Sequence, residues 1–215
     1  HKMESLEEAL GKSNISALAF SPPSLIYVGT SDARVIALDL ETDRSVETLS
    51  LLSNEVTEIN DIAAVGDRLW IGTNGGLLSV DQQFTDQVHL NASNSRLSHN
   101  YVNTLLESDG ILFIGTVDGV DQINPSSIVV YNTRNSGIHN DVSAFARSDD
   151  GTLWIGTYNG LYYMNNDRVH RKASEKYPLL LPEEQITALA PDNRFLWVGL
   201  KNQGLHRLDI ENMTS

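Results

Sequence analysis

The stretch Leu153-Trp154-Ile155-Gly156-Thr157 decides the fold of this 215-residue chain, because it recurs along the whole sequence. Residues 69–73 (LWIGT) and 112–116 (LFIGT) are close copies, and residues 26–30 (IYVGT) and 196–200 (LWVGL) are looser ones. The glycines of the five copies lie at positions 29, 72, 115, 156 and 199, so that successive copies are 41 or 43 residues apart. Five copies in register predict a repeat architecture with five units.

Each unit has the same succession of short apolar segments and turn residues. About ten residues before the aromatic position lies an apolar segment, such as residues 142–145, and a turn such as Asp150-Gly151 separates the two. A second turn, usually ending in glycine, precedes a third apolar segment such as residues 161–165, and a more polar segment follows. Aspartate, asparagine, glycine and proline at these junctions favour tight turns between strands.

This pattern predicts a β-propeller. Apolar residues alternate with period two, which indicates strands, and glycine at the repeated positions argues against helices. A repeat of roughly 40–50 residues with four strands is typical of a propeller blade. We therefore expect an all-β propeller of five four-stranded antiparallel blades with essentially no helix, in a single domain over residues 1–215. The blade repeats are expected at residues 15–52, 59–92, 102–133, 142–173 and 186–215.

The N-terminal segment 3–10 offers a way to close the ring. The fifth unit stops before a proper fourth strand, whereas in the other units a fourth strand precedes a turn like the one at residues 11–14. We therefore expect residues 3–10 to be the strand that completes the fifth blade, because a closed ring leaves no open sheet edge. The alternative is that the five units form one arc of a larger propeller.

The charge balance excludes several classes of function. The 28 acidic residues outnumber the 15 basic ones, and the formal net charge is −13. Binding to nucleic acid or to anionic lipid needs a basic surface, so neither is expected. No apolar run approaches the roughly 18 residues that a membrane span requires, so no direct membrane insertion of this segment is expected. The chain has no cysteine, which excludes disulfides, thiolate metal sites and cysteine nucleophiles.

The repeat resembles that of the two-component regulator propeller family. The resemblance rests on Asp-Gly followed by Leu-Trp-Ile-Gly-Thr, two or three residues and Gly-Leu, as in residues 149–161. It covers the whole chain, although the first unit has Ala33-Arg34 where glycine is expected and the fifth has Leu200 in place of threonine. Such repeats occur in the extracytoplasmic sensor regions of bacterial histidine kinases, hybrid two-component regulators and diguanylate cyclases. The resemblance implies a periplasmic sensing or interaction module of a membrane receptor.

The large aromatic residues favour a packing role. Trp70, Trp154 and Trp197 occupy one repeat position, which they share with Phe113 and Tyr27. Periodic placement predicts that these rings pack between blades, where they bury a large apolar area. The periodic placement favours this packing role over an exposed tryptophan platform that binds a sugar.

Residues that could carry chemistry have simpler interpretations. His99 and His139 precede equivalent strands, but no third metal ligand lies at suitable spacing, so a duplicated turn residue explains both. Asp61, Glu107 and Asp141 lie on or beside the expected inner strands. Glycoside hydrolysis needs two carboxylates at a defined separation, which the sequence does not show. We therefore expect no enzyme activity, no catalytic residue, no metal and no cofactor.

Two sets of loops are expected to meet on one face around the central funnel. They join the second strand of a unit to the third, and the fourth strand to the next unit. Because they vary between units, they can encode a ligand. The candidate binding residues are Asp32, Arg34, Asn74, Asp118, Tyr158, Asn159, Lys201 and Asn202 from the first set, and His99, His139 and Glu184 from the second.

This mixture of donors, acceptors and one aromatic suits a polar small molecule, a glycan or a peptide, and an adjacent receptor domain is a further possible partner. The expected function is non-catalytic ligand sensing or interaction. One alternative is a protein–protein interaction scaffold, which a broad apolar patch would favour. The other is a carbohydrate-binding or carbohydrate-cleaving propeller, which needs aromatic residues at the rim or a carboxylate pair facing the funnel.

Overall fold

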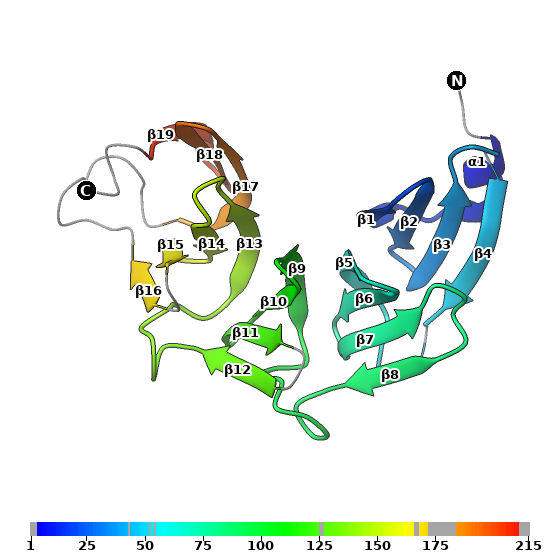
Figure 1. Cartoon of the computed structure of the whole chain (residues 1–215), viewed down its shortest axis with the longest axis horizontal. Coiled ribbons are helices and arrows are strands. Elements are labelled where there is room, and N and C mark those ends of the chain that lie inside the picture. The colour runs from blue at the N-terminus through cyan, green and yellow to red at the C-terminus, as the bar shows by residue number, and fades with distance from the viewer. Residues whose placement is uncertain are drawn as a thin grey trace.

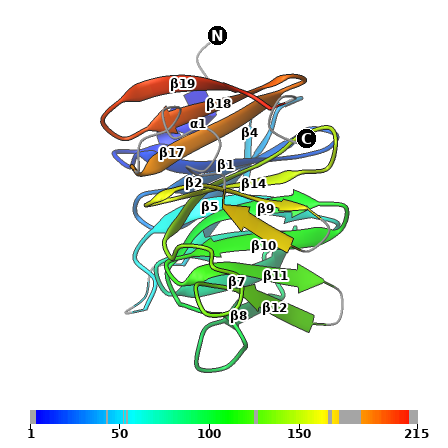
Figure 2. The same cartoon turned by 90° about the vertical axis from the view of Figure 1, so that its left-hand side faces the viewer.

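The computed structural model describes residues 4–42, 44–51, 53, 55–124, 127–165, 168–171 and 184–210. These residues form 19 strands in five antiparallel sheets and one short helix. The sheets follow one another along a curved array, and Figure 1 shows the first and last sheets on opposite sides of an opening. Figure 2 shows the same array edge-on. In this view the strands of different sheets overlap one another, which shows that the sheets form a single layer. Among the described residues, no helix has the length and apolar character needed to cross a membrane.

Each sheet is one blade, with its strands in sequence order from the inside of the arc to the outside. Blade 1 contains β1 (Ile15–Ser21), β2 (Leu25–Thr30), β3 (Arg34–Asp39) and β4 (Arg44–Ser50). Blade 2 contains β5 (Ile59–Val65), β6 (Arg68–Thr73), β7 (Gly76–Asp81) and β8 (Gln87–Leu90). Blade 3 contains β9 (Val102–Ser108), β10 (Ile111–Thr116), β11 (Gly119–Asn124) and β12 (Ser127–Tyr131). Blade 4 contains β13 (Val142–Arg147), β14 (Leu153–Thr157), β15 (Gly160–Asn165) and β16 (Arg168–Arg171). Blade 5 contains β17 (Ile186–Asp192), β18 (Phe195–Leu200) and β19 (Gly204–Asp209).

The repeated Gly-Thr pair ends the second strand of a blade and shapes the turn that follows. In blade 2, Thr73 is paired with Gly76 across the hairpin, and its hydroxyl donates a hydrogen bond to the Gly76 carbonyl at 2.8 Å. Gly76 has a φ of 135°, a backbone region that favours glycine. In blade 1, where the glycine is missing, Ala33 adopts a φ of 59° within the turn.

The apolar core lies between consecutive blades. Alternation along each strand gives every blade two apolar faces. We call the face that packs on the following blade the forward face, and the opposite one the back face. Trp154 lies on the forward face of blade 4, is 1% exposed, and packs in one cluster with Leu196 and Val198 of blade 5. Leu153 and Ile155 point to the back face and pack against blade 3.

The repeat aromatics mostly pack as expected. Tyr27, Phe113 and Trp154 are buried on the forward faces of their blades, and Trp70 is partly buried against the cluster formed with blade 3. Trp197 also lies on a forward face and, like Trp70, is half-buried.

Residues 4–10 form the helix α1 (Glu4–Leu10), so the prediction of a closing strand over residues 3–10 is wrong. The expectation of essentially no helix is wrong for the same reason. The segment ESLEEAL has strong helix formers and no β-branched residue, which favours a helix. Ala9 and Leu10 pack against the outer part of the back face of blade 1, over the buried side chains of Val28, Ile36 and Leu38. Met3 lies outside the described residues.

Candidate functional site

Antiparallel strands place two sets of loops at the same end of every blade. One set joins the second strand to the third, and the other joins one blade to the next; we call this end the loop rim. Backbone hydrogen bonds tie the two sets together: the Tyr158 N–H donates to the Asp141 carbonyl, and the Lys201 N–H donates to the Gln185 carbonyl, each at 3.0 Å. Every candidate residue from the sequence lies in or directly beside these loops.

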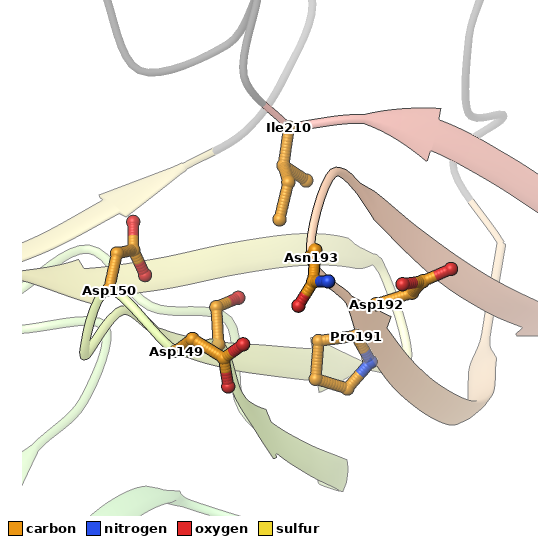
Figure 3. A pocket seen from close by; sticks show the side chains of 7 residues that line it. Asp149, Asp150, Pro191, Asp192, Asn193 and Ile210 are labelled. Carbon is orange, nitrogen blue, oxygen red and sulfur yellow. The ribbon is translucent and has the colours of Figure 1, made fainter.

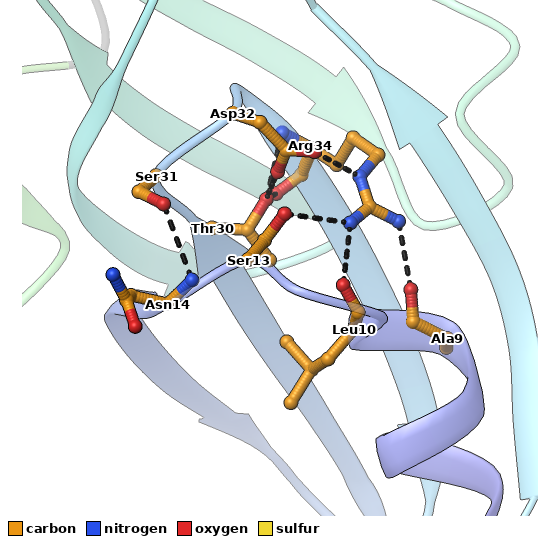
Figure 4. A network of polar contacts seen from close by, with 8 residues as sticks. All are labelled: Ala9, Leu10, Ser13, Asn14, Thr30, Ser31, Asp32 and Arg34. Carbon is orange, nitrogen blue, oxygen red and sulfur yellow. Dashed lines mark hydrogen bonds and ion pairs between the residues drawn. The ribbon is translucent and has the colours of Figure 1, made fainter.

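Asp32 and Arg34 anchor the N-terminal helix (Figure 4). The Arg34 guanidinium donates to the Ala9 carbonyl at 2.7 Å and the Leu10 carbonyl at 2.9 Å, and its Nε donates to Asp32 at 2.9 Å. The Thr30 hydroxyl donates to the other Asp32 oxygen at 2.6 Å. This bond, together with Arg34, lowers the pKa of Asp32 to about 2. Both side chains therefore hold α1 in place, because Arg34 satisfies carbonyls that the helix end leaves without partners.

Four other candidates, Asn74, Asp118, Glu184 and Asn202, cross-link the loops of the rim. In blades 2 and 5 the loop after the second strand is bonded to the connection that precedes the same blade, and in blade 3 it is bonded to the connection that follows the blade. The pairs are Asn74 Oδ1 with Thr57 N at 3.0 Å, Asp118 Oδ1 with Asn140 Nδ2 at 3.0 Å, and Glu184 Oε1 with Asn202 N at 2.9 Å. These bonds fix the shape of the rim before any ligand arrives.

The two histidines shape turns. His99 Nδ1 accepts a hydrogen bond from the Tyr101 N–H at 2.9 Å, and His139 Nδ1 lies 2.6 Å from the Asn140 carbonyl oxygen. Over the described ranges, no group of three or more histidine, aspartate and glutamate residues is arranged to hold a metal ion. The contacts observed are those of turn residues.

Tyr158, Asn159 and Lys201 offer the most accessible chemistry on the rim. The Tyr158 side chain is 53% exposed, Lys201 is exposed, and Asn159 is half-buried. The three lie in equivalent loops of the neighbouring blades 4 and 5. Neither the Tyr158 hydroxyl nor the Lys201 ammonium bonds to another residue in the part of the chain that the structure describes. Together they present an aromatic face, an amide and a cation.

A row of polar residues lies directly before the inner strands. The sequence analysis did not include these residues among the candidate ligand-binding residues. Glu58, Tyr101 and Asp141 each directly precede the first residue of an inner strand, so their common repeat position was the signal that could have found them. The Tyr101 hydroxyl donates to Glu58 at 2.6 Å, and this hydrogen bond raises the pKa of Tyr101. Asn103 Nδ2 donates to Asp141 at 3.1 Å. The row adds acceptors to the rim next to the cross-linked loops.

The inner-strand carboxylates have structural partners. Asp61 accepts hydrogen bonds from the Leu105 N–H at 2.7 Å and the Thr104 hydroxyl at 3.1 Å, which join blade 2 to blade 3. Burial raises the pKa of Asp61. Glu107 accepts a hydrogen bond from the Gly110 N–H at 2.9 Å within its own hairpin.

Asp121 is a buried carboxylate that the sequence prediction did not single out. It lies on β11, is 0% exposed, and accepts hydrogen bonds at Oδ2 from Ser98 N at 2.7 Å and Ser98 Oγ at 3.0 Å. Its Oδ1 has no hydrogen-bond partner among the described residues. Burial raises the pKa of Asp121 to about 6.

The opposite rim carries a pocket of about 550 Å³ between blades 4 and 5. Figure 3 shows Asp149 and Asp150 on one side of this pocket, and Pro191, Asp192 and Asn193 on the other. Ser148 and Ile210 complete the lining. None of the candidate residues from the sequence lies there, since those belong to the loop rim.

Comparisons with known proteins agree with the repeat and the fold. Residues 136–159 match the family model described as two component regulator propeller, which confirms the resemblance over blade 4. No curated protein matches the chain by sequence.

Two similar solved structures are named as extracellular domains of hybrid two component systems, BT4673 and BT3049, from B. thetaiotaomicron. Each has a TM-score of 0.69 and 21% identity, and they cover 90% and 93% of this chain. The chain spans 27% of the length of each. The β-propeller domain of Myceliophteria thermophila Cps50 (Swd1) has a TM-score of 0.63 and 16% identity, covering 95% of this chain and 69% of that one. At these identities the likeness establishes the propeller fold.

Proposed function

We propose that this chain is a non-catalytic recognition module in the extracytoplasmic, periplasmic sensor region of a bacterial receptor of the two-component class. The observation that carries the proposal is the regulator-propeller match over residues 136–159, in a chain whose fold resembles extracellular domains of such systems. The unit that carries the match also supplies Tyr158 and Asn159 to the loop rim.

The loop rim is the proposed recognition surface. Its loops are cross-linked through Asn74, Asp118 and Asn202, so binding costs little ordering of the backbone. Tyr158, Asn159 and Lys201 supply stacking, hydrogen-bonding and cationic contacts from two adjacent blades. The ligand class that fits this set is a polar small molecule, a glycan or a peptide. Binding acts on the receptor by favouring one of its conformational states.

The test is a thermal-shift screen of neutral oligosaccharides and short peptides, followed by titration calorimetry of the first compound that raises Tm. The variant Tyr158→Ala/Lys201→Ala should weaken binding of that compound by about tenfold or more, since each lost contact contributes of the order of 1 kcal/mol. The matched control is Asp67→Ala/Asn193→Ala, which changes exposed residues in hairpins of the opposite rim. If the control variant loses affinity and the rim variant keeps it, the assignment of the surface is wrong.

A carbohydrate is the second candidate within this class, because Tyr158 is an exposed aromatic ring on the rim. Sugar recognition predicts that Tyr158→Phe retains affinity while Tyr158→Ala loses it, since the ring face makes the contact. Peptide recognition through the hydroxyl and Lys201 predicts that Tyr158→Phe also weakens binding.

A further inference from the structure

We propose that the forward face of blade 5 is an interface for one further four-stranded blade of the same repeat, whose inner strand begins with a β-branched residue. Three features of the forward faces lead to this conclusion: a glycine and an apolar third-strand residue that recur in blades 1–4, and a polar side chain that recurs in blades 2–4. In each of them a residue of the next blade completes the contact, and in blade 5 the same feature is present without that residue.

The first feature is a glycine that makes room for the neighbour. A β-carbon on Gly72, Gly115 or Gly156 would come within 2.7, 2.6 and 2.6 Å of Val102, Val142 and Ile186, the first residues of the following inner strands. Gly29 meets Ile59 in the same way at 2.9 Å. Gly199 is the equivalent residue of blade 5. The atoms nearest to its ideal β-carbon belong to its own blade, with Thr187 Oγ1 at 3.2 Å and Ala188 Cβ at 3.4 Å.

The second feature is a polar side chain that reaches the next blade. Asn60 Nδ2 donates to the Val102 carbonyl at 2.8 Å, and Asn103 Nδ2 donates to the Val142 carbonyl at 2.7 Å. In blade 4, Ser143 Oγ donates to the Ile186 carbonyl at 2.5 Å. Thr187 is the equivalent residue of blade 5, and its hydroxyl donates to the carbonyl of Gly199 in its own blade at 3.2 Å.

The third feature is an apolar side chain that the next blade covers. The second residue of the third strand is buried in blades 1–4, where its exposed fractions are 0% for Val35, 0% for Leu77, 0% for Val120 and 2% for Leu161. Leu205 is the equivalent residue of blade 5 and is 68% exposed.

At the other end of the array a helix covers part of the outward face. There α1 lies on the back face of blade 1 and covers Val28, Ile36 and Leu38, leaving Leu18 and Phe20 of the inner strand exposed. A second copy of the chain fits blade 5 poorly. The arc lies in one layer and curves towards its own beginning, so the later blades of a docked copy would run into blade 1 (Figures 1 and 2). A single blade continues an interface that the chain already repeats four times.

The test adds such a blade. In the extended variant, a copy of residues 83–131 follows Ile210 in place of residues 211–215. Ile210 corresponds to Gln82 in the repeat, so the copy supplies a fourth strand for blade 5 and then a blade beginning with the copy of Val102. The expected result is that amide hydrogen exchange in β17–β19 slows by about tenfold or more, because the face becomes buried. A folded extension that leaves exchange in β17–β19 unchanged overturns the proposal.

Gly199→Val is the matched probe of the glycine position. It should change exchange in the 215-residue chain by less than about twofold, and in the extended variant it should abolish the added protection, because the valine fills the space for the copied Val102. Gly156→Val is the control, which should destabilise both proteins. An extended variant that is indifferent to Gly199→Val contradicts the proposed contact.

A second measurement uses the 215-residue chain without the added blade. Analytical ultracentrifugation of the 215-residue chain should show a monomer, and binding of an apolar fluorescent dye should fall by about half or more in Leu205→Glu. If dye binding is unchanged in Leu205→Glu, the proposal that the forward face of blade 5 is open is wrong. A dimer that Leu205→Glu dissociates overturns the choice of a single blade as the partner and assigns the face to a second copy.

Discussion

Gly156 of blade 4 and Ile186 of blade 5 lie so close together that a β-carbon on the glycine would come within 2.6 Å of the isoleucine Cγ2. Neighbouring blades contact each other chiefly through their inner strands, and Gly156, on the second strand β14, faces the first residue of the following inner strand β17. The glycine therefore sets how closely two sheets approach. Its recurrence in the repeat reflects this close approach, and the backbone φ of Gly156 is not positive.

Gly156→Ala should destabilise the chain by about 1–3 kcal/mol, because the added methyl group must displace Ile186 in a packed interface. Gly199→Ala should change the free energy of unfolding by less than about 0.5 kcal/mol, since no following blade crowds that residue. Urea unfolding followed by circular dichroism measures both. Equal losses in the two variants would show that the glycine acts through its own strand and not through the next blade.

Arg34→Lys should release α1 while the blades stay folded. A lysine ammonium cannot reproduce the fork that bonds the carbonyls of Ala9 and Leu10 together with Asp32, and the expected loss is about 1–2 kcal/mol. Tryptic cleavage at Lys12 should accelerate several-fold, because the segment opens more often. Arg68→Lys, at the start of β6 in blade 2, is the control and should leave cleavage at Lys12 unchanged. Equal cleavage rates in Arg34→Lys and the unsubstituted chain would mean that apolar packing alone holds the helix.

Asp121 should make the chain less stable as pH rises from about 4 to about 7. Burial raises its pKa in the folded state to about 6, above the ordinary value of 3.8. A carboxyl group whose pKa is raised on folding stabilises the folded state fully below the unfolded pKa, and this contribution is lost as pH rises through the folded pKa. A shift of roughly two pKa units corresponds to about 3 kcal/mol.

Asp121→Asn removes the ionisable group and keeps an oxygen that can accept the hydrogen bonds from Ser98. The variant should be more stable than the unsubstituted chain by about 1–3 kcal/mol at pH 7.5, with the difference disappearing near pH 4. Denaturant unfolding at both pH values measures this. A variant that is less stable at pH 7.5 would show that the ionised carboxylate has partners that compensate for its burial.

The sequence was sufficient to predict the blades, because their signals are local. Gly-Thr pairs, Asp-Gly turns and alternating apolar residues act within a hairpin, so the five sheets lie where the repeat places them. The segment 4–10 was not predictable in the same way. A short sequence such as ESLEEAL forms a strand only where a sheet edge is available, and it forms a helix where an apolar face and Arg34 receive it.

The candidate site was predicted less well than the fold. The repeat phase identified the loops of the rim, since the position of a loop follows from strand order. It could not separate Asn74, whose side chain bonds to Thr57 in a loop 17 residues away, from Tyr158, whose side chain faces solvent. That distinction depends on distances between loops, and these follow from how the strands pair and pack.

The measurement that tests the recognition function most directly is a hydrogen-exchange footprint of the first compound that binds. We expect the ligand to slow exchange in the loops of the rim, above all at residues 157–160 and 200–203, and to leave exchange in the opposite hairpins unchanged. Protection confined to residues 148–151 and 191–194, around the pocket of the opposite rim, would contradict it.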